Sequence, residues 1–564
     1  MNFDQIGILS LLAAMMAGFA LVRRFEIVAL AGLAIGGVLG FVPTGALFSG
    51  FANPTVITVI EILLIVEVLK RSALLDALSA RVGGNARSQR GLILGLCAAA
   101  AAMSAFMNNI GALALMLPLA ITVCERYGIG LEKVLMPLSF ATLLGGLCSI
   151  VGTPANLLGV MAIEGARGSA FGFFEIAVIG LPLTLAGLVY LWMVLPRQAL
   201  GEAGGTEEAA SSRSFLAEIA VGEQSPLAGL SPGETAERLG ITIHNIVREG
   251  AFVFGREKTI AAGDLVIAEG ERKAMAALTD APPEGWVQAV VMPESIYVGS
   301  SVDDLVAFTE AGVSVVQLGI TPRRVEGRLA DIKLSVGDIV VMQGDRTLIA
   351  TECAEGGLLQ LAPVDAGARR PAYFPLAVFG LGIAASAFAG LDPAIAFGLV
   401  VLCLAITGHL SLRQGFEGLN WSILIMLGAM IPLGQAVADT GAAHALALGM
   451  AGLLPGMDIF ALTAIMLVLS VLLTPFVNNP TTVLVLAPIA VALSAQYGLP
   501  PTPALLAVTV GASLDFLTPF GHHNNTLVMG IAGYRFGDYA RLGAPLVIIC
   551  LIISALIIPF AFGA

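Results

Sequence analysis

Residues 104–129 read SAFMNNIGALALMLPLAITVCERYGI, and residues 474–499 read TPFVNNPTTVLVLAPIAVALSAQYGL. The two segments keep a constant offset of 370 positions. The offset pairs Phe106 with Phe476, Asn108-Asn109 with Asn478-Asn479, Pro118 with Pro488, and Tyr127-Gly128 with Tyr497-Gly498. Agreement at this many special residues indicates an internal repeat, so we expect two related halves.

A second match follows downstream of each segment. Gly145 to Met161 reads GGLCSIVGTPANLLGVM, and Gly511 to Gly530 reads GASLDFLTPFGHHNNTLVMG. Both read as apolar helices interrupted by Thr-Pro and by polar Asn. Paired interruptions at corresponding places in two halves are the best sequence indication of a transporter binding site.

The composition is that of a membrane protein. Of 564 residues, 57% are hydrophobic and 12% are charged, and the mean hydropathy is +0.91. Soluble domains carry about 25% charged residues, so a soluble enzyme, a disordered chain and a nucleic-acid binder are excluded. Long apolar runs satisfy their backbone in lipid as helices. We therefore expect an all-α polytopic membrane protein. The sequence has no Walker A motif and no nucleophile–base constellation, so neither an ATP-driven pump nor an enzyme is predicted.

The charges are concentrated in one block. Residues 197–370 hold 40 of the 68 charged residues and −10 of the net charge of −12. We expect a soluble α+β insertion there, between membrane repeats at 1–196 and 371–564. Each repeat is predicted to hold a re-entrant hairpin (92–124 and 459–497) and a broken helix (134–160 and 502–532). In the first hairpin each arm has about 15 residues, about 23 Å of helix, against about 30 Å of hydrocarbon.

Lys and Arg favour the cytoplasmic side of spans. Arg23-Arg24, Arg71 to Arg90, Arg126, Lys133 and Arg197 follow successive elements of the first half. This places the insertion in the cytoplasm and the chain in the plasma (inner) membrane, crossing it several times. The second half begins inside, at Arg369-Arg370, and its hairpin ends fall outside. The halves are therefore predicted to be inverted repeats whose hairpins enter from opposite faces.

The interruptions are candidate binding elements. Helix N-termini attract anions, and unwound carbonyls and Asn oxygens can hold a small cation. Half-helices are expected to start after Asn109 and Asn479, and after Thr153-Pro154 and Thr518-Pro519. Their four N-termini, meeting at mid-membrane, would make an anion site without Lys or Arg. The alternative is that these residues only cap and kink packed helices. The candidate substrate-binding residues are Asn108, Asn109, Thr153, Pro154, Asn156, Asn478, Asn479, Thr518, Pro519, Asn524 and Asn525.

Two further residues are candidates for coupling transport to an ion. Asp515 is a carboxylate within an apolar run, and such a residue is a functional candidate by default. It could bind a cation, carry a proton or cap a helix end. His522 could carry a proton or simply line a solvated cavity.

Both halves resemble the divalent anion/sodium symporter family. The hairpin tips, the loops GTPAN (152–156) and LTPFGHHNNTLV (517–528), and GYRFGDYARLG (533–543) carry the resemblance. It implies a homodimer, elevator-type alternating access and Na⁺ coupling. By position, Asn108 with Gly152 would form one Na⁺ site, and Asn478 with Gly521 the other. Asn109, Thr153, Asn479 and Thr518 would face the substrate.

The insertion resembles two TrkA-C (RCK C-terminal-like) domains, at 213–279 and 285–352. Each shows a strand, a small helix and two strands, ending in GDLVIAEG (263–270) or GDIVVMQGD (337–345). The resemblance implies dimerisation or regulation by a small ligand such as a nucleotide. The insertion also favours sulfate as the substrate within the symporter family.

The sequence therefore predicts a Na⁺-coupled importer of a small divalent anion, with sulfate favoured. A Na⁺- or H⁺-coupled dicarboxylate transporter is the nearest alternative. A ligand-gated channel or membrane sensor is the alternative of another class, because TrkA-C domains also regulate K⁺ systems.

Overall fold

The computed structural model describes residues 2–21, 25–70, 88–169, 171–195, 373–417, 419, 421–453 and 456–563, and most of 215–361. Within 215–361 the gaps are 224, 250, 254–257, 271–274, 276–277, 279–285, 294, 306–311 and 320–327. Several of the basic residues used to predict orientation, including Arg23, Arg71 and Arg197, lie outside the described residues.

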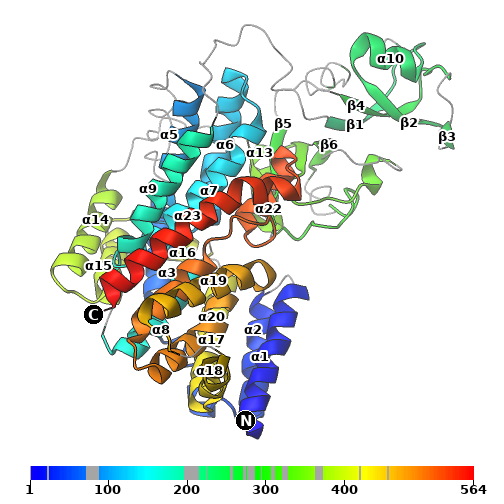
Figure 1. The fold of residues 1–564 in the computed structure, drawn as a ribbon. Helices are drawn as coiled ribbons and strands as arrows, with labels where there is room; N and C mark the ends of the chain where they lie inside the picture. The colour runs from blue at the N-terminus through cyan, green and yellow to red at the C-terminus, as the bar shows by residue number, and fades with distance from the viewer. Residues whose placement is uncertain are drawn as a thin grey trace.

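The first half is helical, as the composition predicts (Figure 1). Three helices, α1 (Phe3–Leu21), α2 (Phe25–Val38) and α3 (Pro54–Lys70), precede the first repeated segment. That segment forms α5 (Gln89–Ser104) and α6 (Asn109–Tyr127). The first interrupted segment then forms α7 (Leu135–Gly145), a 3₁₀ turn η3 (Gly146–Cys148) and α8 (Pro154–Arg167), and α9 (Ala177–Val194) ends the half.

The second half follows the same plan. It runs through α14 (Tyr373–Phe388), α15 (Pro393–Ile406), the short α16 (Leu412–Glu417), α17 (Trp421–Asp439) and α18 (Ala442–Leu453). The second repeated segment forms α19 (Ile459–Val477) and α20 (Asn479–Gln496). The second interruption separates α21 (Pro501–Ala512) from α22 (His523–Ala532), and α23 (Phe536–Phe562) follows.

The helices before the repeated segments pair crosswise between the halves. The helix α3 packs against α14 and α15, and α17 packs against α1 and α2. The repeated segments and broken helices pack on one another: α19 on α21, α5 on α7, and both α20 and α21 on α8. Every residue of α7 is buried, as is every residue of α21 from Pro503 onward. These two half-helices lie at the centre of the helical core.

Five helical segments of the described chain are long and apolar enough to cross a membrane. A sixth is added if α17 and α18, bent by 62° at their break, form one span. The arms of the first hairpin have 16 and 19 residues, against about 15 predicted, and the arms of the second have 19 and 18. Whether they cross or re-enter the bilayer stays a prediction.

The insertion contains an eight-stranded antiparallel sheet, of order β3-β2-β4-β1-β6-β7-β5-β8. The first repeat supplies β1 (Phe215–Ala220), β2 (Thr242–Arg248), β3 (Ala251–Val253), β4 (Leu265–Gly270) and helix α10 (Pro232–Leu239). The second supplies β5 (Trp286–Val291), β6 (Ser314–Gly319), β7 (Ile339–Gln343), α13 (Arg346–Gly356) and β8 (Leu358–Gln360). The insertion is therefore α+β, as predicted, although half of the helix expected at 301–312, namely 306–311, lies outside the described residues.

The two repeats of the insertion are joined head to tail. By sequence, β1, β2 and β4 correspond to β5, β6 and β7. The junction pairs β1 with β6, through Phe215–Gly319 and Leu216–Leu318, so the strands of the second repeat continue the order of the first. The division into two TrkA-C-like units at 213–279 and 285–352 stays a prediction. Their strands share one sheet, which extends to residue 360.

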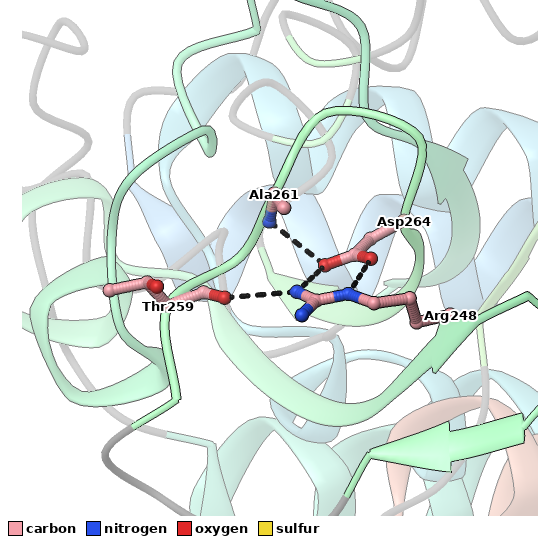
Figure 2. A network of polar contacts seen from close by, with 4 residues as sticks. All are labelled: Arg248, Thr259, Ala261 and Asp264. Atoms are coloured by element: carbon pink, nitrogen blue, oxygen red, sulfur yellow. Dashed lines mark hydrogen bonds and ion pairs between the residues drawn. The ribbon is translucent and has the colours of Figure 1, made fainter.

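An ion pair between the exposed Arg248 and the buried Asp264 holds the turn before β4 (Figure 2). Arg248 donates from Nε and Nη2 to the two carboxylate oxygens of Asp264, at 2.6 and 2.7 Å. The amide of Ala261 donates to the same carboxylate at 2.8 Å. In the second repeat Ser335 N donates likewise to Asp338, at 2.7 Å. The same turn is thus built twice in the insertion.

Candidate functional site

The first hairpin tip is a capped helix start. Asn108 is the N-cap of α6, and its side-chain oxygen accepts from Gly111 N at 2.8 Å. The next residue, Asn109, is buried and contacts Ser104 Oγ at 2.7 Å. The backbone amides at the start of α6 therefore point at the tip, as the sequence predicts.

The second tip repeats this arrangement with one difference. Asn478 caps α20 by accepting from Thr481 N at 3.0 Å, and Thr474 Oγ1 donates to Asn479 at 3.1 Å. Thr474 stands 370 positions after Ser104. However, Asn478 has φ 67° and ψ 162°, whereas Asn108 has φ −63° and ψ 154°. Such a positive-φ extended conformation is essentially restricted to glycine, so the second tip is strained and the first is not.

The first interruption is held together by Asn156. Its amide nitrogen donates to Gly146 O at 2.9 Å and to Ser149 O at 2.8 Å, which ties α8 to the end of α7. Thr153 caps α8 through Ala155 N at 3.3 Å, and Pro154 is the first helical residue. Gly152 lies so close to Gly146 O that a Cβ would approach to 2.2 Å. The prediction that α8 starts at Thr153-Pro154 is confirmed.

The second interruption differs from the prediction. The helix α22 does not start after Thr518-Pro519; it starts at His523, with His522 as N-cap accepting from Asn524 N at 3.1 Å. Thr518 instead accepts from Gly521 N within the loop, and Pro519 O accepts from Thr526 Oγ1 at 2.7 Å. The second loop is longer than the first, and the contacts of Asn524 with Asn109 and Thr142 fix where α22 begins.

Asn525 then occupies the position of Asn156. Both stand three residues after the N-cap. Asn525 donates from its amide to Asp515 O at 2.6 Å and to Thr518 O at 3.2 Å. Ser139 and Tyr539 bond to Asn525 in turn, at 2.7 Å each. The two Asn residues therefore brace their loops, and these contacts occupy their amide nitrogens.

Asp515 lies inside the second loop with its charge unmatched. Its side chain is 1% exposed, and neither carboxylate oxygen has a hydrogen-bond partner among the described residues. It packs against the backbone of Gly521, where a Cβ would come within 1.9 Å of Oδ1. Burying a carboxylate without a partner costs free energy, and binding a cation or a proton at Asp515 would lower this cost.

The tip of the first hairpin contacts both broken helices. Asn109 faces acceptors at Thr142 O and Gly152 O, 3.0 and 3.2 Å from its amide nitrogen once that nitrogen is turned towards them. The other amide atom lies 3.4 Å from His522 Nε2. Since His522 Nδ1 accepts from Asn524 N, the proton is on Nε2. The Asn109 atom that faces this proton must therefore be the amide oxygen. This is the same amide orientation that turns the nitrogen of Asn109 towards Thr142 O and Gly152 O.

Asn524 completes this junction. Its amide nitrogen donates to Asn109 O and to Thr142 Oγ1, each at 2.9 Å. The second tip is tied to its own half, because Thr474 Oγ1 also donates to Ala512 O at 3.0 Å. Sequence reasoning missed Ser104, Ser139, Thr142 and Thr474; Ser104 and Thr474 could have been found, because they open the two repeated segments.

The local electrostatics suit an anion without a basic clamp. The sequence has no Lys or Arg between Lys133 and Arg167, or between Arg413 and Arg535. Among the described residues, no group of three or more His, Cys, Asp or Glu could hold a metal ion. The helix N-termini are the groups that could attract an anion here, and the loop carbonyls and Asp515 are the groups that could hold a cation.

Comparison with known proteins identifies the family. The sequence profile of the CitMHS family, described as citrate transporter, matches residues 10–511 and 458–564. The chain belongs to the CitMHS family. Its relatives include YfbS of Escherichia coli, an uncharacterized transporter 27% identical over 100% of both chains. Sodium/sulfate cotransporter 2 of Chlamydomonas reinhardtii is 24% identical over 52% of this chain and 38% of that protein.

The YdaH transporter of Alcanivorax borkumensis is a structural neighbour of this CitMHS protein, with 13% identity, a TM-score of 0.42 and coverage of 100% and 99%. The family and the relatives are transporters. The prediction of a membrane transporter of this general type is therefore confirmed. The substrate, the coupling ion and the roles of individual residues remain predictions.

Proposed function

We propose that this CitMHS protein is a secondary transporter that imports a small divalent anion, with sulfate favoured, together with Na⁺. The observation that carries the proposal is the junction of Asn109, Gly152, His522 and Asn524, where one hairpin tip meets both broken helices. The starts of α6, α8 and α22 are brought near one another there. Their partial positive charges favour an anion, and relatives named sodium/sulfate cotransporters support the choice of ions.

The candidate Na⁺ sites lie beside this junction. Asn108 and Gly152 would form one, and Asn478 and Gly521 the other. Both Asn oxygens already accept a backbone amide, and a carbonyl oxygen has a second lone pair for a cation. Asp515, against Gly521, would supply the negative charge near the second site. If the coupling ion were H⁺, Asp515 and His522 would carry it.

Transport is proposed to follow an elevator mechanism in a homodimer. The crosswise bundles of α3, α14, α15 and of α1, α2, α17 would form the fixed scaffold. The hairpins and broken helices, which pack on one another, would move as a unit. The insertion would lie in the cytoplasm of a plasma (inner) membrane protein. It would act as a pair of TrkA-C-like regulatory domains, with a nucleotide as one candidate ligand.

A carboxylate substrate is the second candidate, and the description of the matching family favours it. The site has no Lys or Arg clamp to separate the two chemistries. Against a gated channel stands the lack of a TVGYG-like carbonyl filter in the sequence.

Uptake into proteoliposomes tests the proposal. Radiolabelled sulfate uptake should rise with an inward Na⁺ gradient, and Asn108→Ala and Asn478→Ala should abolish this rise. Asn53→Ala, at a helix start remote from the junction, is the matched control. Succinate or citrate uptake without sulfate uptake would keep the mechanism and replace the substrate. Uptake driven by a pH gradient alone would refute Na⁺ coupling.

A further inference from the structure

The sheet insertion touches one of the broken helices directly. The turn before β7 lies against the C-terminal part of α22, which Figure 1 shows beside the insertion. A Cβ built on Gly530 of α22 would lie 2.2 Å from Val336 O and 2.9 Å from Gly337 Cα. A Cβ on Gly337 would lie 2.6 Å from Gly530 Cα. The two backbones are therefore in contact.

This contact depends on two glycines. Real Cβ atoms do not approach backbone as closely as 2.6 Å, so any side chain at Gly530 or Gly337 would push the turn and the helix apart. Apolar packing extends the contact, because Ile531 of α22 and Ile339 and Val341 of β7 belong to one continuous hydrophobic cluster. That cluster joins the helical core to the second repeat of the sheet.

The equivalent turn in the first repeat makes no such contact. Gly263 precedes β4 as Gly337 precedes β7, and the two have nearly the same φ, +90° and +86°. Among the described residues, no atom lies within 4 Å of a Cβ built on Gly263. The turn therefore adopts this conformation without a contact like that of Gly337 with Gly530, which is an additional feature of the second repeat.

The far end of α22 lies in the candidate site. His522 and Asn524 stand at its start and contact Asn109, as described above. From Asn524 to Gly530 is six residues, about 9 Å of helix. A single short, rigid element therefore connects the sheet to the junction of the two halves.

We propose that the second repeat of the sheet clamps α22 and restrains it, so that release of the turn at Gly337 from Gly530 frees the helix and speeds transport. The partner that restrains α22 is thus the insertion of this same chain. The transport part of this inference rests on the proposed function; the clamp itself does not.

Hydrogen exchange of the full chain tests the clamp without any substrate. Gly530→Ala should accelerate exchange in the turn 335–338 and along 523–533. Helix propensity alone would slow exchange along 523–533, because Ala stabilises a helix more than Gly does. Gly337→Ala should do the same from the other side. Gly263→Ala, which places Ala at the same φ in the turn without a contact, is the matched control and should leave α22 unchanged.

Unchanged exchange along 523–533 in both Gly530→Ala and Gly337→Ala would overturn the clamp. Anion uptake then tests the restraint: both variants should take up anion faster than the wild type and the Gly263→Ala control. Faster exchange with equal or slower uptake would overturn the restraining role. If the wild type takes up no anion, the proposed function fails, while the exchange data still decide for or against the clamp.

Discussion

Asn109 and His522 lie 3.4 Å apart, although 413 positions separate them in the chain. Each residue also serves its own half. Asn109 follows the N-cap of α6, and His522 is the N-cap of α22. Their contact therefore couples the first hairpin to the second broken helix at the place where we propose that substrate binds.

Replacing His522 by Asn should weaken substrate binding without unfolding α22. Asn is a good N-cap, but its shorter side chain does not reach Asn109. Losing one hydrogen bond costs about 1 kcal/mol, so the KM for uptake should rise roughly fivefold. His523→Asn, at the neighbouring position, is the control, and equal effects of the two variants would argue against a specific role for His522.

The strain at Asn478 predicts an unusual separation of stability and function. Glycine adopts the observed conformation freely, and relief of such strain is worth about 1–3 kcal/mol. Gly is only a few tenths of a kcal/mol worse than Asn as a cap. Asn478→Gly should therefore be at least as stable to heat as the wild type, whereas Asn108→Gly should be less stable.

The same Asn478→Gly variant should lose Na⁺-stimulated uptake, because the side-chain oxygen proposed to contact the cation is gone. Thermal unfolding in detergent and uptake in proteoliposomes measure the two properties separately. If Asn478→Gly unfolds at a lower temperature than the wild type and its uptake still rises with Na⁺, both the strain at Asn478 and the proposed Na⁺ site are contradicted.

Asp515→Asn should remove ion coupling and leave the fold intact. The side chain keeps its shape, and the loss of a buried charge without a described partner should raise the thermal unfolding temperature. Uptake is measured against Na⁺ at fixed pH and against pH at fixed Na⁺. Loss of the first dependence assigns Asp515 to the cation, and loss of the second assigns it to a proton. If both dependences persist, Asp515 has no coupling role.

The sequence predicted the tips and the first interruption because their signals are local. Asn before an apolar helix is a cap signal, and it occurs twice at one offset. The start of α22 was predicted wrongly for a related reason. Thr-Pro is a strong start signal, but in the second half the longer loop and the contacts of Asn524 with the first half set the boundary four residues later.

Other features depend on contacts that no local pattern encodes. The pairing of β1 with β6 joins strands about a hundred residues apart, so the single sheet was not foreseen. The helix α18 was also missed, since its apolar sequence continues that of α17. The approach of Gly337 to Gly530 has no sequence signal except two glycines, which are common in this chain.

The ion pair of Arg248 and Asp264 predicts an acid-sensitive sheet. Hydrogen bonds from the Arg248 guanidinium hold the pKa of Asp264 below its ordinary value of 3.8. A lowered pKa in the folded state means that this stability is present above pH 4 and is lost as the pH falls through the folded pKa. Exchange of β4 amides in Asp264→Asn should already be fast at neutral pH.

The matched control for Asp264→Asn is Glu237→Gln, which removes an exposed carboxylate on α10. It should leave the exchange of β4 unchanged across the same pH range. Equal acid sensitivity of the wild type and Asp264→Asn would show that other carboxylates control the transition.

The junction between the two repeats of the sheet should be its weakest point. Among the described residues, two residue pairs join β1 to β6, and the ion pair of Arg328 with Glu218 supports them. Arg328 Nη2 donates to Glu218 Oε1 at 2.5 Å, and Leu329 N donates to Oε2 at 3.2 Å. Glu218 is mostly buried while Arg328 is half exposed, so the pair contributes less than about 1 kcal/mol.

Glu218→Gln should therefore accelerate exchange at 215–216 and 318–319 by a few-fold and leave the interior pairing of β5 with β7 unchanged. If β5 and β7 lost protection equally, the eight strands would unfold as one unit and the junction would have no independence. If only the junction responds, the two repeats can separate there, with the second still held against α22.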